Sequence, residues 1–362
     1  MAKILFLVPY PSGEAPSQRF RFEQYFVSLE KASHQYEVHS FLDVGTWQIL
    51  YKKGNNWAKI KGIVSGFWRR FQLLWGLKKF DFVFIHREAT PIGLPWVEWY
   101  IAKIARKKII FDFDDAIWLP DSAKTGFLKK LVKCYWKTSY LCRYAYKVSA
   151  GNDYLCDYAL QYNSNTFLNP TTIDTENLHN PFHFEQLTSL TRTKTIGWTG
   201  THSTLMYLDF LVPILQKLEQ KYAFVFLVIA NKMPHFQLKS LRYVPWQKTT
   251  EIADLMQMDL GLMPLTDDAW AKGKCGFKAL QYMSLGIPAV ASPVGVNTKM
   301  IEHGKNGWLC DTAKEWELIL TQWLNDEGFD EKEMSANARQ SVIQYYSVKS
   351  NEQNFLHLFE HL

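Results

Sequence analysis

Two lysines beside a glycine turn, in the second half of the chain, combine residue types that can bind a phosphate. Lys274 precedes a run whose apolar residues recur at helical spacing, and Lys278 lies in the first turn of that run. Gly273 and Gly276 let backbone approach a ligand, and the N–H groups at a helix start favour an anion. The helix dipole contributes about 0.3–1 kcal/mol and each charge-assisted hydrogen bond roughly 1.5–3 kcal/mol, so the lysines must do most of the binding. The pattern indicates a diphosphate site, and solvated lysines on an ordinary loop and helix are the alternative.

The helix that carries Lys278 has recognisable ends. It begins near Phe277 and ends at Gly286, because glycine suits a helix C-terminus and Pro288 prevents continuation. Gln281 lies on the same face as Lys278 and offers a neutral amide to sugar hydroxyls. A short buried strand is expected to follow at residues 289–292.

Continuous apolar runs of strand length recur along the chain, as expected for parallel strands buried on both faces. A chain of 362 residues suits two domains of ordinary size, and helical segments separate the runs, which predicts an α/β fold. The first loop lacks a GxGxxG pattern, so a dinucleotide cofactor is not expected. The expected strands include residues 3–8, 81–85 and 108–113 in the first half, and 194–198, 223–230 and 260–264 in the second.

Three aspartates stand at the carboxyl end of the strand expected at residues 108–113, where folds of this class bind ligands. Asp112, Asp114 and Asp115 are oxygen donors that a metal could use. Capping of the next helix by Asp114 or Asp115 is the alternative. We expect no bound metal here.

Composition and charge narrow the classes of protein. The net charge of +6 fits an anionic ligand or an anionic membrane surface, and no nucleic-acid-binding motif is present. Five cysteines without a CxxC pair are typical of a reduced cytosolic protein. Residues 51–80 hold eight Lys or Arg and no Asp or Glu, with aromatic residues between them. That composition predicts a helix on an anionic membrane surface. A helix packed on a sheet with a basic outer face explains it almost as well.

The motifs GKCGFK, LQYM, GIPAVASPVGVN and HGKNG, all within residues 272–307, resemble the donor-binding segment of family 4 retaining glycosyltransferases of the GT-B type. The resemblance covers most of the second half and, more weakly, the first. It implies two Rossmann-like domains whose parallel sheets face each other across a cleft. The implied divisions are an acceptor-side domain at 1–180, a nucleotide-sugar-binding domain at 181–345 and a C-terminal helix at 346–362 packing back on the first domain. Residues 169–193 have linker composition.

The resemblance also assigns roles to residues. Lys274 and Lys278 stabilise the departing diphosphate, and Asp114 approaches the anomeric centre of the donor. Family members carry two glutamates where this chain has Gly273 and Gln281, which leaves Asp267 or Asp268 to replace them. Candidate acceptor contacts are Ser12, Gly13, Arg19 and Arg21. Candidate donor contacts are Gly197, Thr199, Gly200, Trp246, Asp267, Gly273, Gly276, Phe277 and Gln281.

The implied reaction is transfer of a sugar from a nucleotide diphosphate sugar to a hydroxyl group with retention, in cell-surface polysaccharide or glycolipid assembly. The acceptor would be a saccharide or a lipid-linked saccharide, with no cofactor, no metal and no nucleic acid. A cytoplasmic protein is expected, and residues 51–80 leave open peripheral attachment to the inner face of the cell membrane. A GT-B-type nucleotide-sugar epimerase and a non-catalytic nucleotide-sugar-binding subunit are the alternatives.

Overall fold

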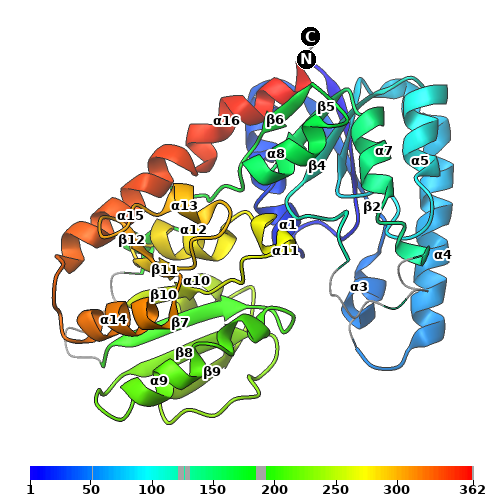
Figure 1. Ribbon diagram of the computed structural model, residues 1–362. Helices are drawn as coiled ribbons and strands as arrows, with labels where there is room; N and C mark the ends of the chain where they lie inside the picture. The colour runs from blue at the N-terminus through cyan, green and yellow to red at the C-terminus, as the bar shows by residue number, and fades with distance from the viewer. Residues whose placement is uncertain (51, 121–125, 127–130, 185–192, 361–362) are drawn as a thin grey trace. The chain divides into compact units, whose positions relative to one another are not determined.

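A computed structural model describes residues 1–50, 52–120, 126, 131–184 and 193–360 (Figure 1). The chain divides into two compact units, which are described separately below. Unit 1 comprises Met1–Thr171, Gly273–Cys275 and Asn351–Leu362, and unit 2 comprises Thr172–Lys272 and Gly276–Ser350. The first boundary thus follows Thr171, and the glycine turn with Lys274 belongs to unit 1. Part of the expected linker, residues 185–192, lies outside the described residues, as do residues 51 and 361–362.

Unit 1 is built on a six-stranded sheet in the order β2-β1-β3-β4-β5-β6, and all its strand pairs are parallel. The central strands are mostly apolar and almost wholly buried because helices cover both faces of the sheet. The phenylalanine rings of β1 and β3 pack with those of the C-terminal segment. In the same segment, Phe355 stacks on Tyr25 with ring centroids 4.3 Å apart. The strands are β1 Lys3–Val8, β2 Gln35–Ser40, β3 Phe82–His86, β4 Lys108–Phe113, β5 Lys147–Ala150 and β6 Thr166–Leu168.

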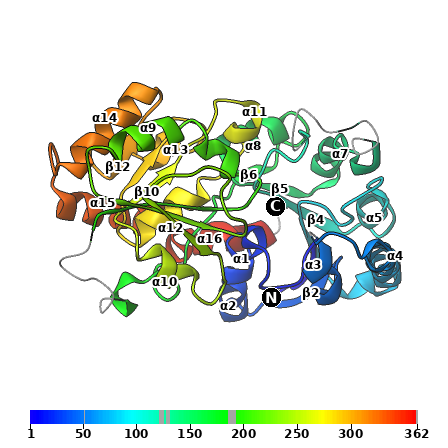
Figure 2. The same cartoon turned by 90° about the horizontal axis from the view of Figure 1, so that it is seen from below.

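The helices of unit 1 are mostly short, and α4 is the longest of them. Asn152 begins α8, because its side chain accepts a hydrogen bond from the Leu155 N–H at 2.9 Å. In Figures 1 and 2, α4 runs along the periphery of unit 1. The helices are α1 Pro16–Arg19, η1 Glu23–Tyr25, α2 Phe26–Lys31, α3 Val44–Leu50, α4 Asn56–Leu73, η2 Leu74–Lys79, α5 Trp96–Trp99, the π-helix η3 Tyr100–Ile104, α7 Lys137–Tyr144, α8 Asp153–Leu160, α16 Val348–Leu356 and η7 His357–Phe359.

Unit 2 has a second six-stranded parallel sheet, in the order β12-β11-β10-β7-β8-β9. Its core packs apolar strand residues against α9 and α14 and contains the buried rings of Trp198, Trp316 and Trp323. A capping box of Thr312 and Glu315 begins α14. The strands are β7 Thr195–Gly200, β8 Val225–Ala230, β9 Leu241–Pro245, β10 Leu260–Met263, β11 Ala289–Ala291 and β12 Gly307–Leu309.

The helices of unit 2 include α12, which carries Lys278 as expected. Gly286 follows α12 with a φ of +75°, a left-handed conformation that glycine adopts without strain. The helices are η4 Pro181–His183, η6 Leu205–Leu208, α9 Val212–Leu218, α10 Glu251–Leu255, α11 Ala269–Lys272, α12 Phe277–Ser284, α13 Asn297–Met300, α14 Ala313–Leu324 and α15 Glu331–Tyr345. In the described part of the chain, no helix is both long and apolar enough to cross a membrane.

Candidate functional site

The strand order of unit 2 points to one place for a ligand. Counted from its first strand, the sheet has the doubly wound order, in which β7 is followed in space by β8 and β9 on one side and by β10 to β12 on the other. In such sheets, ligands bind outside the carboxyl ends of the strands where the order reverses. Here that reversal lies between β7 and β10. The loop after β7 begins at Thr201, and the segment after β10 leads through α11 and the glycine turn into α12.

The start of α12 requires glycine at position 276. Gly276 has a φ of +69°, and a Cβ there would lie 2.5 Å from Met300 Sδ. As the residue before the first helical turn, Gly276 has no side chain to accept from the N–H groups of that turn. Those N–H groups and the positive end of the helix dipole are the features that favour an anion.

Lys278 lies in that first turn and is half-buried. Its Nζ lies 5.5 Å from the ring centroid of Trp198, and Trp198 belongs to the carboxyl-terminal half of β7. The ammonium group therefore stands over an indole that the core holds at 1 % exposure. A cation–π contact of this kind positions a charge without neutralising it. The structure thus brings Lys278 close to the carboxyl-terminal half of β7, at the edge where doubly wound sheets bind their ligands.

Lys274 has a different setting, because Gly273–Cys275 packs within unit 1. A Cβ on Gly273 would lie 2.7 Å from the Ala116 Cβ and 2.8 Å from its backbone nitrogen. The Lys274 carbonyl accepts from Asn152 Nδ2 at 3.0 Å, and Cys275 Sγ lies 3.1 Å from the Asp114 carbonyl oxygen. Burial raises the pKa of the Cys275 thiol. The glycine at 273 is explained by this close packing, whereas the sequence suggested close approach to a ligand.

The candidate donor residues on β7 also serve the packing of the sheet. A Cβ on Gly197 would lie 2.2 Å from Met258, and one on Gly200 would lie 2.5 Å from the Trp198 ring. The Thr199 N–H donates to the Tyr282 hydroxyl at 2.9 Å, and burial raises the pKa of that hydroxyl. The backbone at the end of β7 is therefore rigidly held against α12.

Other candidate donor residues are less favourably placed. Gln281 is buried and donates from Nε2 to Glu251 Oε1 at 3.3 Å, so its amide is turned into unit 2 and is not presented to a sugar as expected. Asp267 is exposed and forms an ion pair with Lys272 at 3.0 Å. Trp246 and Phe277 are both half-buried. The Trp246 N–H donates to the Ala230 carbonyl at 3.0 Å, which fixes its backbone at the end of β8.

A buried polar network occupies the carboxyl ends of the strands in unit 1. Asp112 is fully buried and pairs with Arg21, and it also accepts from Ser149 Oγ at 2.6 Å. His86 Nδ1 lies 2.8 Å from Asp112 Oδ2 and must donate to it, because an ionised carboxylate can only accept. Burial would raise the pKa of Asp112, but the charge of Arg21 and the bond from His86 outweigh it and lower that pKa. Arg21 is thus committed to Asp112, which corrects the expectation that it contacts a ligand.

Asp114 is held in place by Arg87, a residue with an unusual backbone. Arg87 follows β3 with a φ of +59°, and its Nε lies 2.7 Å from Asp114 Oδ1 while its Nη2 lies 2.6 Å from Asp115 Oδ2. Burial disfavours the charged form, yet Arg87 outweighs it and lowers the pKa of Asp114. His86 Nε2 lies 3.9 Å from Asp114 Oδ1, too far for a hydrogen bond. Asp114 is therefore a fixed carboxylate, and a left-handed arginine is a feature that concentrates at functional sites.

The candidate acceptor residues lie in the loop after β1. The strand order of unit 1 reverses between β1 and β3, so this loop and Arg87 stand at the corresponding ligand-binding position of the first sheet. Ser12 is exposed, and the Gly13 N–H donates to Glu23 Oε2 at 2.8 Å. Arg19 is half-buried, with its guanidinium carbon 4.9 Å from the Phe20 ring centroid.

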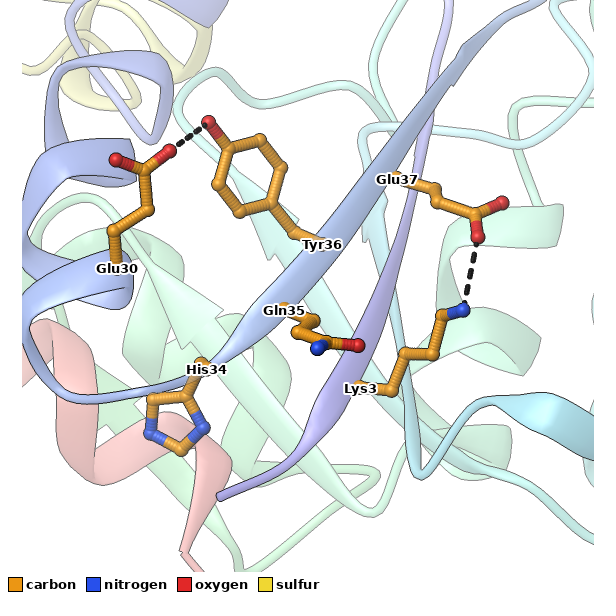
Figure 3. A pocket seen from close by; sticks show the side chains of 6 residues that line it. All are labelled: Lys3, Glu30, His34, Gln35, Tyr36 and Glu37. Carbon is orange, nitrogen blue, oxygen red and sulfur yellow. Dashed lines mark hydrogen bonds and ion pairs between the residues drawn. The ribbon is translucent and has the colours of Figure 1, made fainter.

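Two surface hollows lie away from these positions. One, of about 500 Å³, is lined by Lys3, Glu30 and residues 34–37, and Figure 3 shows the Tyr36 hydroxyl pointing to Glu30 and the Lys3 ammonium to Glu37. Lys3 and Gln35 begin their strands, so this hollow lies at the amino end of the sheet, opposite the end that binds ligands. The other, of about 560 Å³, lies beside Arg339 in unit 2. Within the described residues, no group of three His, Cys, Asp or Glu side chains could hold a metal ion.

Sequence reasoning missed several residues that shape these positions. Trp198 orients Lys278, Tyr282 holds the Thr199 backbone, and Arg87 fixes Asp114. Trp198 stands between two candidate residues, and Arg87 stands two residues after the strand expected at 81–85, so their positions in the sequence could have indicated a role. Their partners lie far away along the chain, and the sequence does not indicate these pairings.

Comparison with known proteins finds one family match, in the second half of the chain. Residues 193–326 match the family described as glycosyl transferases group 1, and these residues include both strands of the reversal in unit 2 and all of α12. The match covers most of unit 2 and less than half of the whole chain. The expected resemblance to glycosyltransferases is confirmed for that segment. No curated protein matches the chain significantly in sequence.

Solved structures extend the likeness to the whole chain. HepE of Anabaena in complex with UDP has a TM-score of 0.62 at 14 % identity, covering 98 % of each chain. Sucrose-phosphate synthase of Thermosynechococcus elongatus has a TM-score of 0.71 at 12 % identity, and the catalytic domain of starch synthase IV of Arabidopsis thaliana, bound to ADP and acarbose, has 0.69 at 12 %. Both cover 99 % of this chain and 98 % of their own. At such identities the likeness shows a shared fold, and the expected α/β fold of the GT-B type is confirmed.

Proposed function

We propose that this protein transfers a glycosyl group from a nucleotide diphosphate sugar to a hydroxyl group of a saccharide or lipid-linked saccharide, with retention, in cell-surface polysaccharide or glycolipid assembly. The observation that carries the proposal is the position of Lys278, in the first turn of α12 and over Trp198 of β7. That position lies at the strand-order reversal of unit 2, most of which matches the glycosyl transferases group 1 family. A fixed ammonium group there can stabilise the charge that develops on a departing diphosphate.

The ligands of structurally similar proteins support a nucleotide diphosphate donor. HepE of Anabaena binds UDP and, in other crystals, UDP-glucose, and starch synthase IV of Arabidopsis thaliana binds ADP. Unit 2 of this chain offers such a ligand Lys278 and the uncapped first turn of α12. The neutral loop after β7 adds hydroxyl and N–H groups, and a charge from Lys274 remains part of the proposal.

Asp114 supports the part of the proposal that concerns the sugar. Because Arg87 keeps its pKa low, Asp114 is ionised at neutral pH and does not donate a proton. An ionised carboxylate instead stabilises the positive charge that grows on the sugar ring. In the proposed step the bond from the anomeric carbon to the phosphate oxygen breaks on the face where the bond to the acceptor oxygen forms. The acceptor proton passes to the departing phosphate oxygen, so the step needs no protein side chain as a base.

A binding-only protein is the second candidate, because the chain lacks the paired glutamates of the family it resembles and Gln281 is buried against Glu251. Such a protein would bind a nucleotide sugar and leave it intact. A nucleotide-sugar epimerase would instead consume donor without an acceptor.

The test begins with thermal shifts for uridine, adenosine, guanosine and thymidine diphosphate sugars, since a bound donor raises stability by mass action. Donors that bind are then incubated with and without a panel of saccharide and lipid-linked saccharide acceptors, and the anomeric configuration of any product is read by NMR. Consumption that requires an acceptor, with retention, is expected. Inversion would refute the retaining mechanism, consumption without an acceptor would indicate an epimerase, and binding without consumption would indicate the binding-only protein.

A further inference from the structure

Helix α4, Asn56–Leu73, presents its large apolar side chains outward. Their spacing of three or four residues puts them on one face of the helix, where they form an apolar stripe. This stripe continues into η2 at Trp75. A helix that packs on a globular core normally buries such a stripe. The exposed fractions are 85 % for Trp57, 51 % for Ile60, 61 % for Val64, 57 % for Trp68, 41 % for Phe71 and 69 % for Trp75.

The opposite face of α4 explains why the stripe stays outside. Gly62, Gly66 and Arg70 recur every four residues and are buried. A Cβ on Gly62 would lie 2.1 Å from Thr46 Oγ1, and one on Gly66 would lie 2.7 Å from the Phe41 carbonyl oxygen. A larger side chain cannot replace either glycine at this distance, so the helix cannot rotate its stripe inward.

Arg70 fixes the same orientation from within unit 1. Its guanidinium donates to the carbonyls of Val8 at 2.9 Å, His39 at 3.0 Å and Ala89 at 2.8 Å, and its side chain is 1 % exposed. Burial lowers the pKa of Arg70 to about 9, and Glu98 only partly opposes this effect. An arginine buried at this cost holds α4 against the ends of two strands and a loop. The outward stripe is thus a fixed property of the fold.

The charge around the stripe indicates which kind of partner could cover it. Residues 52–79 contain eight Lys or Arg and no Asp or Glu. Lys52, Lys53, Lys61 and Lys78 are exposed, at both ends of the stripe and beside it. A second copy of this chain would bring two such basic surfaces together, which like charge disfavours. A nucleic acid would satisfy the cations but not the aliphatic and indole side chains. An anionic lipid surface satisfies both, because indoles lie at the interface, aliphatic groups enter it and lysines contact headgroups.

We propose that the outer face of α4 and η2 docks on a bilayer that contains anionic lipids, with α4 lying in the plane of the membrane. Trp57, Trp68 and Trp75 anchor it, and the lysines beside them supply the electrostatic attraction. This inference does not depend on the proposed transferase reaction, because the composition and burial of α4 carry it alone.

The test is flotation of the full chain with vesicles of phosphatidylcholine, with and without about a quarter of phosphatidylglycerol. Binding is expected only to the anionic vesicles, and about 0.5 M salt should reduce it because the attraction is screened. Replacing Trp57, Trp68 and Trp75 by serine should reduce the bound fraction about tenfold or more, since stable surface binding needs apolar burial as well as charge. Leu318→Ser is the matched control, because Leu318 is 55 % exposed on α14 and lies outside the stripe.

Circular dichroism and thermal unfolding of the triple variant should match the wild type, since its three indoles are exposed. Failure of the wild type to bind anionic vesicles would overturn the proposal, as would equal binding by the triple variant. Dimers that the triple substitution dissociates, measured by light scattering without lipid, would assign the stripe to a second copy instead. If the wild type transfers sugar at a normal rate but does not float with anionic vesicles, the proposed function stands and the membrane-docking proposal is refuted.

Discussion

Replacing Lys278 by alanine separates a role in stability from a role in the reaction. The Lys278 Nζ lies 5.5 Å from the Trp198 ring centroid, and its side chain is half-buried. A partly exposed cation–π contact is worth about 0.5–1 kcal/mol. In a domain of this size, 1 kcal/mol changes the melting temperature by about 2–4 °C. Loss of this contact in Lys278→Ala should therefore lower the melting temperature by no more than about 4 °C.

The expected effect on the reaction is larger. A charge-assisted hydrogen bond from an ammonium group to a phosphate oxygen is worth about 1.5–3 kcal/mol, and each 1.36 kcal/mol is a factor of ten in rate. Lys278→Ala should thus reduce kcat/KM about 10- to 150-fold. Because charge on the leaving diphosphate grows toward the transition state, kcat itself should fall, and the loss should not appear in KM alone. Lys278→Arg keeps the charge and should recover part of the rate.

The measurement is initial-rate kinetics with a donor and an acceptor found by the screens above, on variants whose melting temperatures are known. Lys272→Ala is the matched control, because Lys272 lies on α11 just before the glycine turn and its ammonium is paired with Asp267 at 3.0 Å. That variant should retain kcat/KM within about twofold, as expected for a surface ion pair. A wild-type kcat/KM for Lys278→Ala, or an equal loss in both variants, would refute the assignment of the diphosphate to the start of α12.

Two further predictions concern unit 1. Asp112→Asn leaves the buried guanidinium of Arg21 without its carboxylate and should cost about 3–5 kcal/mol in urea unfolding. Because its folded pKa lies below the ordinary 3.8, the contribution of Asp112 is present above that pH and is lost as the pH falls; equal acid sensitivity of wild type and variant would contradict this. Gly66→Ala places a methyl group 2.7 Å from the Phe41 carbonyl oxygen and should cost about 1–3 kcal/mol. Gly76→Ala, with nothing within 4 Å, should not lower the melting temperature, and equal effects would refute the packing argument.

The strands were the most predictable part of the fold. The runs expected at 3–8 and 108–113 have the same limits as β1 and β4, because a parallel strand buried on both faces is a nearly continuous apolar run. The order of the strands was not predictable, since a strand buried on both faces carries no mark of its neighbour. That order is what places the ligand-binding reversals after β7 and β1. The structure therefore shows where the candidate residues lie in the fold, which the sequence alone did not predict.

At the site, the helix that carries Lys278 was predicted with its start, but the surroundings of its residues were not. Helical spacing puts Gln281 on the face of Lys278, yet Gln281 is buried against Glu251, thirty positions earlier in the chain. The same limit applies to α4, whose basic and aromatic composition fits either a packed helix or a membrane-bound one. The close contacts of Gly62 and Gly66 and the buried bonds of Arg70 show which face is turned inward.

The distribution of charge explains why the proposed reaction should depend so strongly on Lys278. In unit 1, Arg21 is paired with Asp112 and Arg87 with Asp114 and Asp115, so these arginines neutralise the protein's own carboxylates. In unit 2, the loop after β7 holds no Lys or Arg between residues 201 and 204. In the proposed reaction, the charge on the departing diphosphate is then stabilised mainly by Lys278 and the first turn of α12. Substitution of Arg21 should accordingly appear in stability, whereas substitution of Lys278 should appear in the rate.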